Sequence, residues 1–290
     1  ADKVLYTGQL ADDFAIATDD ITLITRTAGD VVINYTGNGP LTLRQVYVLA
    51  GSLIVNTPGD LLVLDARLLS NTGDYTVQLH AGGNVTIDHL DAGDYAATES
   101  VAAAIRSARG LAADAPLTTL NNVAITAGAA IREAGSGDSD VDLVANRLTL
   151  TAGTGISGLR LAANTLVSAT SNSGSISLTE TDGSGELSPG LTVGTLTAPA
   201  GIGLTTVGGL SVAKATSAAA GADIRLIASN GPLTLVPRAG QTQMLTAGGD
   251  LQLEGTEIVW GGTNSAGDNV TVNSGGNLLV NSGFSLLSDN

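Results

Sequence analysis

A short phrase recurs along the chain, and its repetition constrains the fold more than any other feature of the sequence. The phrase is a Gly or small polar residue, often followed by Asp or Asn, and then an apolar, variable, apolar triplet. Copies begin at Gly29, Gly39, Gly51, Gly59, Gly73, Gly83, Gly174, Gly209, Gly231, Gly249, Asp268 and Gly276. Self-similarity of this kind is the sequence signature of a repeat architecture.

The spacing of the copies gives the length of one repeat. The steps from Gly29 to Gly51 and from Gly51 to Gly73 are both 22 residues (51 − 29 and 73 − 51), with a further copy inside each step. Each coil of about 22 residues therefore carries at least two short strands. One coil cannot bury its inward Val and Leu side chains, but coils stacked about 4.8 Å apart align them into continuous apolar ladders.

We therefore predict an all-β protein folded as a right-handed parallel β-helix (β-solenoid), the hand being the one that parallel crossovers prefer. A content of 38 Gly and only 3% aromatic residues favours a thin aliphatic core with many tight turns. The inward positions expected to line one core include Leu53, Leu61, Val77, Val85, Leu148, Ile176, Leu233, Leu251, Val270 and Leu278.

One segment breaks the repeat. Between Asp94 and Arg109 the apolar residues Val101 and Ile105 lie four apart, and Gly110 follows a basic last turn. This pattern predicts a short helical or loop insertion over 94–116, emerging from a corner of the solenoid. It divides the chain into an N-terminal solenoid part (1–93) and a C-terminal solenoid part (117–290).

Charge and cysteine content exclude several classes of function. With 27 Asp and Glu against 12 Lys and Arg, the formal charge of −15 would repel a phosphate backbone, so nucleic acid is not expected as a partner. No apolar run reaches the roughly 20 residues that span a bilayer, so no membrane insertion is expected. The absence of Cys excludes a thiol nucleophile and a thiolate metal site.

Several phrases resemble the repeats of very large secreted bacterial exoproteins of the filamentous haemagglutinin type. They are AITAGAAIREAG at 124–135, NRLTLTAGTGI at 146–156, GSISLTE at 174–180 and LTAGGDL at 245–251. The resemblance covers nearly the whole chain except the insertion. The sequence shows no counterpart of that family's N-terminal secretion domain, and none of a C-terminal toxin or anchor.

The resemblance implies a right-handed parallel β-helix from the middle of a stalk, with a structural or adhesive role and no catalysis. It implies an extracellular or cell-surface location. The expected partners are further repeats of the same parent chain or other copies arranged end to end, together with a glycan or protein on a host or neighbouring cell.

Parallel β-helices also include pectin-degrading lyases and hydrolases, so a carbohydrate-active enzyme is the main alternative. Such enzymes place carboxylates with a base on one face of adjacent coils. The candidate carboxylates are the doublets Asp12-Asp13 and Asp19-Asp20, and no His-Gly pair or Arg-x-Lys phrase accompanies them. We therefore expect no enzyme activity. A glycan-binding or protein-binding module is the third alternative.

Two groups of residues could hold a metal ion. His80, Asp88, His89 and Asp91 are close in sequence, but a Gly82-Gly83 turn separates His80, and the neighbours Asp88 and His89 point to opposite faces. Exposed histidines explain this group better.

The second group is Asp138, Asp140 and Asp142, which alternate in a Gly-rich loop and suit Ca²⁺. The loop occurs once, so a plain acidic loop is the simpler interpretation. Calcium is the one cofactor candidate.

Trp260 is the only Trp, beside the Gly261-Gly262 turn. We interpret it as a core or end-cap residue, and it is the first place to look for a ligand patch. The last repeat, Leu278 to Leu287, runs in full repeat style without a polar cap, so the C-terminal coil is expected to be an open edge.

Overall fold

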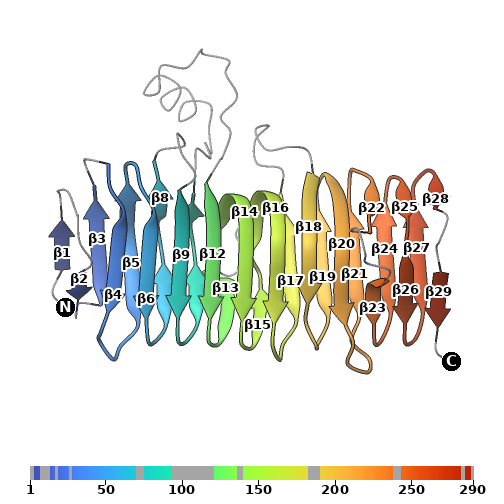
Figure 1. Cartoon of the computed structure of the whole chain (residues 1–290), viewed down its shortest axis with the longest axis horizontal. Coiled ribbons are helices and arrows are strands. Elements are labelled where there is room, and N and C mark those ends of the chain that lie inside the picture. Colours follow the sequence, from blue (N-terminus) through green and yellow to red (C-terminus); the bar gives the residue numbers. More distant parts are fainter. Residues whose placement is uncertain are drawn as a thin grey trace, which may run out of the picture.

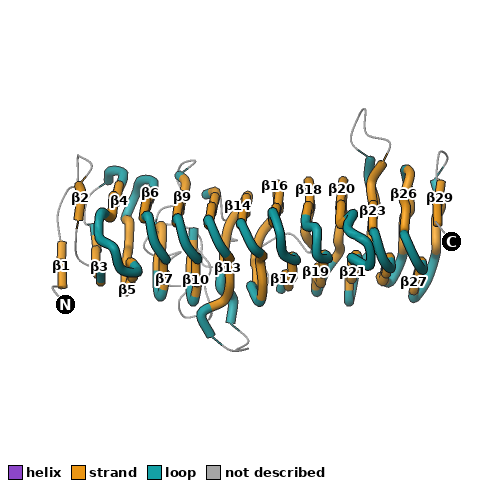
Figure 2. The backbone as a smooth tube through the Cα atoms, turned by 90° about the horizontal axis from the view of Figure 1, so that it is seen from below, coloured by secondary structure: helices purple, strands orange, loops and turns teal. Residues whose placement is uncertain are grey.

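A computed structural model of the chain describes residues 3–6, 14–16, 19–25, 28–69, 75–92, 121–135, 140–181, 190–237, 243–281 and 285–288. Within these residues the chain forms 29 strands and no helix, and the strands follow one another along a rod with β1 and β29 at opposite ends (Figure 1). Segments that are one coil apart in sequence lie side by side along the rod, and turns join them (Figure 2). The predicted all-β parallel solenoid is confirmed. The insertion predicted over 94–116 lies outside the described residues.

Three parallel ladders run along the rod, and we call them its first, second and third faces. The first face holds β2 (Phe14–Ile16), β4 (Val31–Tyr35), β6 (Leu53–Thr57), β9 (Thr76–Ala81), β12 (Asn122–Ala127), β14 (Leu143–Ala152), β16 (Arg160–Ser171), β18 (Gly190–Thr197), β20 (Gly209–Ser217), β23 (Gln243–Ala247), β26 (Thr263–Ala266) and β29 (Ser285–Ser288).

The second face holds β1 (Lys3–Tyr6), β3 (Asp20–Ile24), β5 (Leu41–Val48), β7 (Leu61–Val63), β10 (Val85–Ile87), β13 (Ala130–Glu133), β15 (Gly155–Ser157), β17 (Ile176–Glu180), β19 (Ile202–Thr206), β21 (Ile224–Ala228), β24 (Leu251–Gly255) and β27 (Val270–Ser274). The third face holds β8 (Ala66–Leu68), β11 (Leu90–Asp91), β22 (Leu233–Leu235), β25 (Ile258–Trp260) and β28 (Leu278–Val280), with the second half of β5 and the first halves of β14, β16, β18 and β20.

Coil length varies while the strands of each ladder stay paired, with register shifts near Thr22, Thr149 and Leu245. The 22-residue step holds between Asp30 and Ser52, where the carboxylate of Asp30 accepts the N–H of Ser52 at 2.7 Å. Equivalent hydrogen bonds join turns that are 18 residues apart, as between Asp142 and Arg160, and 27 residues apart at another position. One step, from Asn84, spans 46 residues and contains the segment of the predicted insertion. Across this step β9 and β12 are still paired, so the ladder of the first face continues.

The core is one continuous cluster that extends from Ile21 to Ala266. Eight of the ten predicted inward side chains are at most 1% exposed, which confirms them as core: Leu53, Leu61, Val77, Val85, Leu148, Ile176, Leu233 and Leu251. Val270 is partly buried and packs against this core in register with Leu251, so it also lines the core. The prediction for Leu278 was wrong: this side chain is 49% exposed, because within the described residues β28 pairs on one side only and no further coil covers it.

Turns between the first and second faces are tied together by Asp and Asn side chains. The Asp60 carboxylate accepts the backbone N–H and the side-chain amide of Asn84, at 2.7 and 3.1 Å. Asn84 in turn accepts the N–H of Ala130 at 3.2 Å. Asp223, Asp250 and Asn269 form a second chain of this kind nearer the C-terminus. Each side chain thus satisfies a backbone donor of the next coil, which explains the Asp or Asn in the repeated phrase.

Glycine at the same corner is required by close stacking. A side chain at Gly128 would overlap the carbonyl oxygen of Gly82 one coil before, and a side chain at Gly153 would overlap that of Gly128. The backbones can therefore stack at the coil spacing only where no Cβ intervenes.

Candidate functional site

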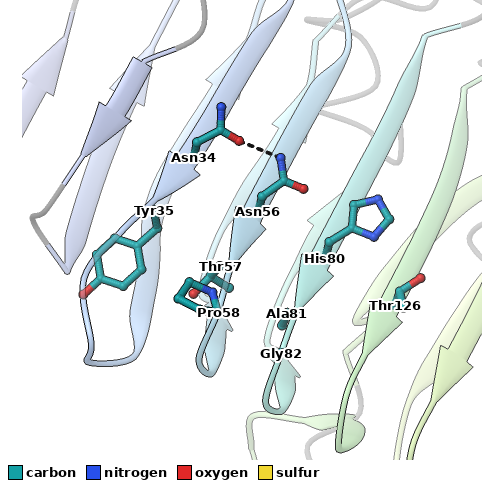
Figure 3. Close-up of a pocket in the computed structure, with 9 residues that line it drawn as sticks. All are labelled: Asn34, Tyr35, Asn56, Thr57, Pro58, His80, Ala81, Gly82 and Thr126. Atoms are coloured by element: carbon teal, nitrogen blue, oxygen red, sulfur yellow. Dashed lines mark hydrogen bonds between the residues drawn. The ribbon is translucent and has the colours of Figure 1, made fainter.

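A column of polar side chains points outward from the N-terminal half of the first face (Figure 3). Asn34 of β4, Asn56 of β6, His80 of β9 and Thr126 of β12 occupy the same register position on successive coils. The side-chain amide of Asn56 donates to the Asn34 oxygen at 2.7 Å. Because the strands alternate inward and outward residues, the apolar neighbours of these side chains lie in the core.

A shallow hollow of about 310 Å³ opens beside this column. Tyr35, Thr57, Pro58, Ala81 and Gly82 complete its lining, and no carboxylate takes part. A second hollow, of about 240 Å³, lies further along the same face. These surfaces can donate and accept hydrogen bonds, but they lack the paired acid and base that glycosidic cleavage requires.

The third face carries a charged network that the sequence did not reveal. Tyr47 of β5 donates its hydroxyl proton to Asp65, and the Arg67 guanidinium donates to the other Asp65 oxygen at 2.7 Å. The guanidinium also lies 5.5 Å from the centre of the Tyr47 ring, within the range of a cation–π contact. Burial and the hydrogen bond to Asp65 raise the pKa of Tyr47. Burial alone would lower the pKa of Arg67, but the hydrogen bond and negative charge of Asp65 outweigh it and the net change is upward.

On the next two coils, the network meets three buried or half-buried groups: His89 and Asp91 on the first of them and Asp142 on the second. His89 Nδ1 lies 3.2 Å from the carbonyl oxygen of Val141, so this nitrogen carries the proton and donates. Burial, and then the charge of Arg67, lower the pKa of His89. Asp91 and Asp142 are 5% and 2% exposed, and Asp142 accepts the N–H of Arg160 at 2.6 Å.

The candidate catalytic doublets do not form an acid–base pair in the described residues. Asp12 and Asp13 lie outside them. Asp20 is held by Arg44, whose Nη2 is 2.7 Å from the Asp20 carboxylate, while Asp19 is exposed. The hydrogen bond to Asp20 raises the pKa of Arg44.

The first metal grouping is divided between two faces. His80 is exposed on β9 of the first face, whereas His89 and Asp91 belong to the third face. Among the described residues, no group of three or more His, Asp or Glu side chains is placed to hold a metal ion.

The calcium candidate is described only in part, because Asp138 lies outside the described residues. Asp140 is exposed, and Asp142 is buried with a carboxylate oxygen directed at the Arg160 N–H. The calcium site stays a prediction.

Trp260 lies in the core, which agrees with the prediction that it is a core or end-cap residue. It is 3% exposed on β25, in register with Val280 of the last coil. Its ring therefore offers no face to a ligand.

Within the described part of the chain there is no helix that could cross a membrane. Comparisons with protein-family models, with curated proteins and with solved structures find nothing that matches this chain.

Proposed function

We propose that this chain is a structural or adhesive segment of a large extracellular bacterial surface protein, in which stacked coils build a stalk or filament. The fold and the resemblance of its repeats to filamentous haemagglutinin-type exoproteins support this proposal. A solenoid of stacked coils gives length and a large lateral surface without requiring a catalytic centre.

The observation that carries the proposal is the exposed C-terminal coil. Within the part of the chain that the structure describes, strands β27, β28 and β29 each pair with one neighbour only. The same coil exposes five large apolar side chains, with relative exposures from 40 to 59%: Leu278, Leu279, Val280, Leu286 and Leu287. Unpaired backbone groups beside apolar side chains form a template for another coil. The partner we propose is a further coil of the same repeat, from the parent chain or from another copy.

The charged network on the third face is the one observation that favours the enzyme alternative. It brings Asp65, Arg67, His89 and Asp91 together on neighbouring coils. However, Asp65 is engaged by Tyr47 and Arg67, and Asp91 is only 5% exposed. Carboxyl groups that are engaged or buried cannot reach a polymeric substrate, so we favour a structural role for the network.

The proposal predicts association through the open edge. Small-angle scattering should show the long axis of the particle growing as the protein concentration rises. Replacing Leu279 and Leu287 by Lys should stop this growth, because charges on the edge oppose strand addition. In the matched control, Lys replaces Leu49 and Leu69, which are 40% and 41% exposed on the side of the rod. This variant should associate like the unmodified chain.

Two results would contradict the proposal. One is a rod that stays monomeric over a wide concentration range. The other is that the variant with charges on the edge still associates while the Leu49 and Leu69 variant does not. The contact between copies would then be on the side of the rod.

A further inference from the structure

The outward column of the first face changes character beyond Thr126 and becomes a row of hydroxyl groups. The pairing places one Thr or Ser at the same position on seven successive strands of this face: Thr126, Thr151, Thr170, Thr197, Thr216, Thr246 and Ser265. Adjacent strands lie about 4.8 Å apart, so the hydroxyl groups repeat at that spacing along the rod.

These side chains are fixed on the surface by the core beneath them. Thr151 is partly exposed between the buried Leu150 and Ala152, and Thr197 is partly exposed between the buried Leu196 and Ala198. A β-branched side chain in a strand has restricted χ1 freedom, so each Thr presents its hydroxyl and methyl group in few orientations. The row is therefore preorganised.

A second row lies beside the first on the same strands. Thr149, Ser168 and Thr195 are in register with one another, two residues before Thr151, Thr170 and Thr197. The two rows are separated by two residues of extended chain, or about 6.6 Å. Together the two rows, which we call the hydroxyl array, form a grid. No member of the array is charged or aromatic, and the second row ends where Lys214 follows Thr195 on β20.

The other faces of the same coils show that strand propensity does not explain this regularity. On the second face, the register position of Ser177 is occupied on following coils by Gly203, Arg225, Gln252 and Thr271. On the third face, that of Ser211 is followed by Thr234, Val259 and Leu279. The side-chain chemistry changes from coil to coil at these positions, whereas the first row keeps hydroxyl groups from Thr126 to Ser265 and is followed by Leu287.

We infer that the hydroxyl array binds ice, that is, the surface of an ordered lattice of water. A single exposed hydroxyl gains almost nothing by exchanging one water for another. Many such contacts add up only if the ligand is rigid and repeats at the spacing of the array, because each further contact is then intramolecular. The oxygen atoms on the faces of hexagonal ice form such a repeat. The methyl groups of Thr fit between lattice waters without competing for hydrogen bonds.

A sugar polymer fits the array less well. Sugar sites depend on aromatic faces, and the single Trp of the chain, Trp260, is buried in the core. The array also lacks the amide, carboxylate and guanidinium groups that make paired hydrogen bonds to a sugar ring. The inference rests on the register of the ladders and does not depend on end-to-end assembly.

Thermal hysteresis and adsorption to a growing ice crystal test the inference on the purified chain. The unmodified protein should shape ice crystals and become incorporated into the ice. Replacing Thr170 and Thr197 together by Tyr should reduce hysteresis about tenfold or more, because bulky rings hold the lattice away from the neighbouring hydroxyl groups. Replacing the same pair by Val keeps volume and β propensity and should also weaken binding.

The matched control replaces Thr179 and Thr205 by Tyr. These two residues are also in register on neighbouring coils, but on the second face, and hysteresis should stay unchanged. Circular dichroism verifies that each variant is folded. The same measurements on a Leu279→Lys background separate this inference from the assembly proposal, because that change charges the open edge on the third face and leaves the array on the first face intact.

Three results would overturn the inference. The first is a folded unmodified chain without hysteresis or incorporation into ice. The second is equal loss in the first-face and second-face Tyr variants. The third is retention on crystalline cellulose or chitin without any effect on ice, which would identify a polysaccharide surface as the ligand.

Discussion

His89 is the residue whose surroundings differ most from those its sequence position suggests. The sequence predicts an exposed histidine, but the side chain is half-buried beside β11 and donates to the carbonyl oxygen of Val141. The charged groups around it are Asp65 and Arg67 on the preceding coil and Asp88 beside it. Burial outweighs the attraction of the two carboxylates, so the folded state favours neutral imidazole.

This lowered pKa predicts a defined pH dependence of stability. The unfolded chain binds a proton near pH 6.5, whereas the folded chain resists protonation of His89 until a lower pH. The contribution of His89 to the free energy of unfolding is therefore fully present above pH 6.5 and declines as the pH falls below it. Urea unfolding at a series of pH values should show this decline. In His89→Gln the slope should be flatter, and an unchanged slope would contradict the assignment.

At the scale of the strand, the alternation of the repeated phrase predicts which side chains enter the core. Leu251 is fully buried on β24 between Ile224 and Val270, and the next residue, Gln252, points outward. Leu251→Ala should lower the free energy of unfolding by about 2–5 kcal/mol, because it leaves a cavity in the ladder. Gln252→Ala, its neighbour on the same strand, should change it by about 0.5 kcal/mol or less. Equal effects of the two changes on thermal unfolding would show that the inward register is misassigned.

The strands of the third face were harder to predict because no turn-forming residue marks the corner that precedes them. Leu64-Asp65 joins β7 to β8 without Gly or Pro, and β5 crosses the same corner as one continuous strand, where its pairing with β3 skips Arg44. Two strands per coil were predictable from the turns, and the third was not.

The sites depend on register, which the sequence leaves open. The Tyr47–Asp65 and His89–Val141 contacts join residues 18 and 52 positions apart. The hydroxyl array likewise becomes visible only once coils of different length are aligned, from 19 residues between Thr151 and Thr170 (170 − 151) to 30 between Thr216 and Thr246 (246 − 216). Individual Thr and Asp residues could be read from the sequence, but their neighbours one coil away could not.

At the scale of the whole molecule, each coil contacts only its neighbours, so stability is a sum of local terms. The described C-terminal coil has a neighbour on one side only, and Trp260 lies directly beneath it, in register with Val280. Loss of the last coil would expose Trp260 before the rest of the rod unfolds.

Trp260 thus reports on the end of the rod. In a urea titration, its fluorescence should change at a lower denaturant concentration than the far-ultraviolet circular dichroism of the whole chain. The Leu279→Lys, Leu287→Lys variant, which weakens the last coil further, should widen the gap between the two midpoints. Coincident transitions in both proteins would indicate that the rod unfolds as one cooperative unit.

The direction of the hydrogen bonds has a mechanical consequence. In every ladder the backbone bonds run from coil to coil, along the axis of the rod. A pull on the two ends therefore loads the junctions between coils in series, and an end coil peels away before an inner one. A stacked coil adds about 4.8 Å to the length of the rod, whereas the same coil of about 22 residues, once released and extended, spans roughly 70 Å. Under tension such a rod would lengthen in steps at nearly constant force, while the coils still stacked keep their surface unchanged.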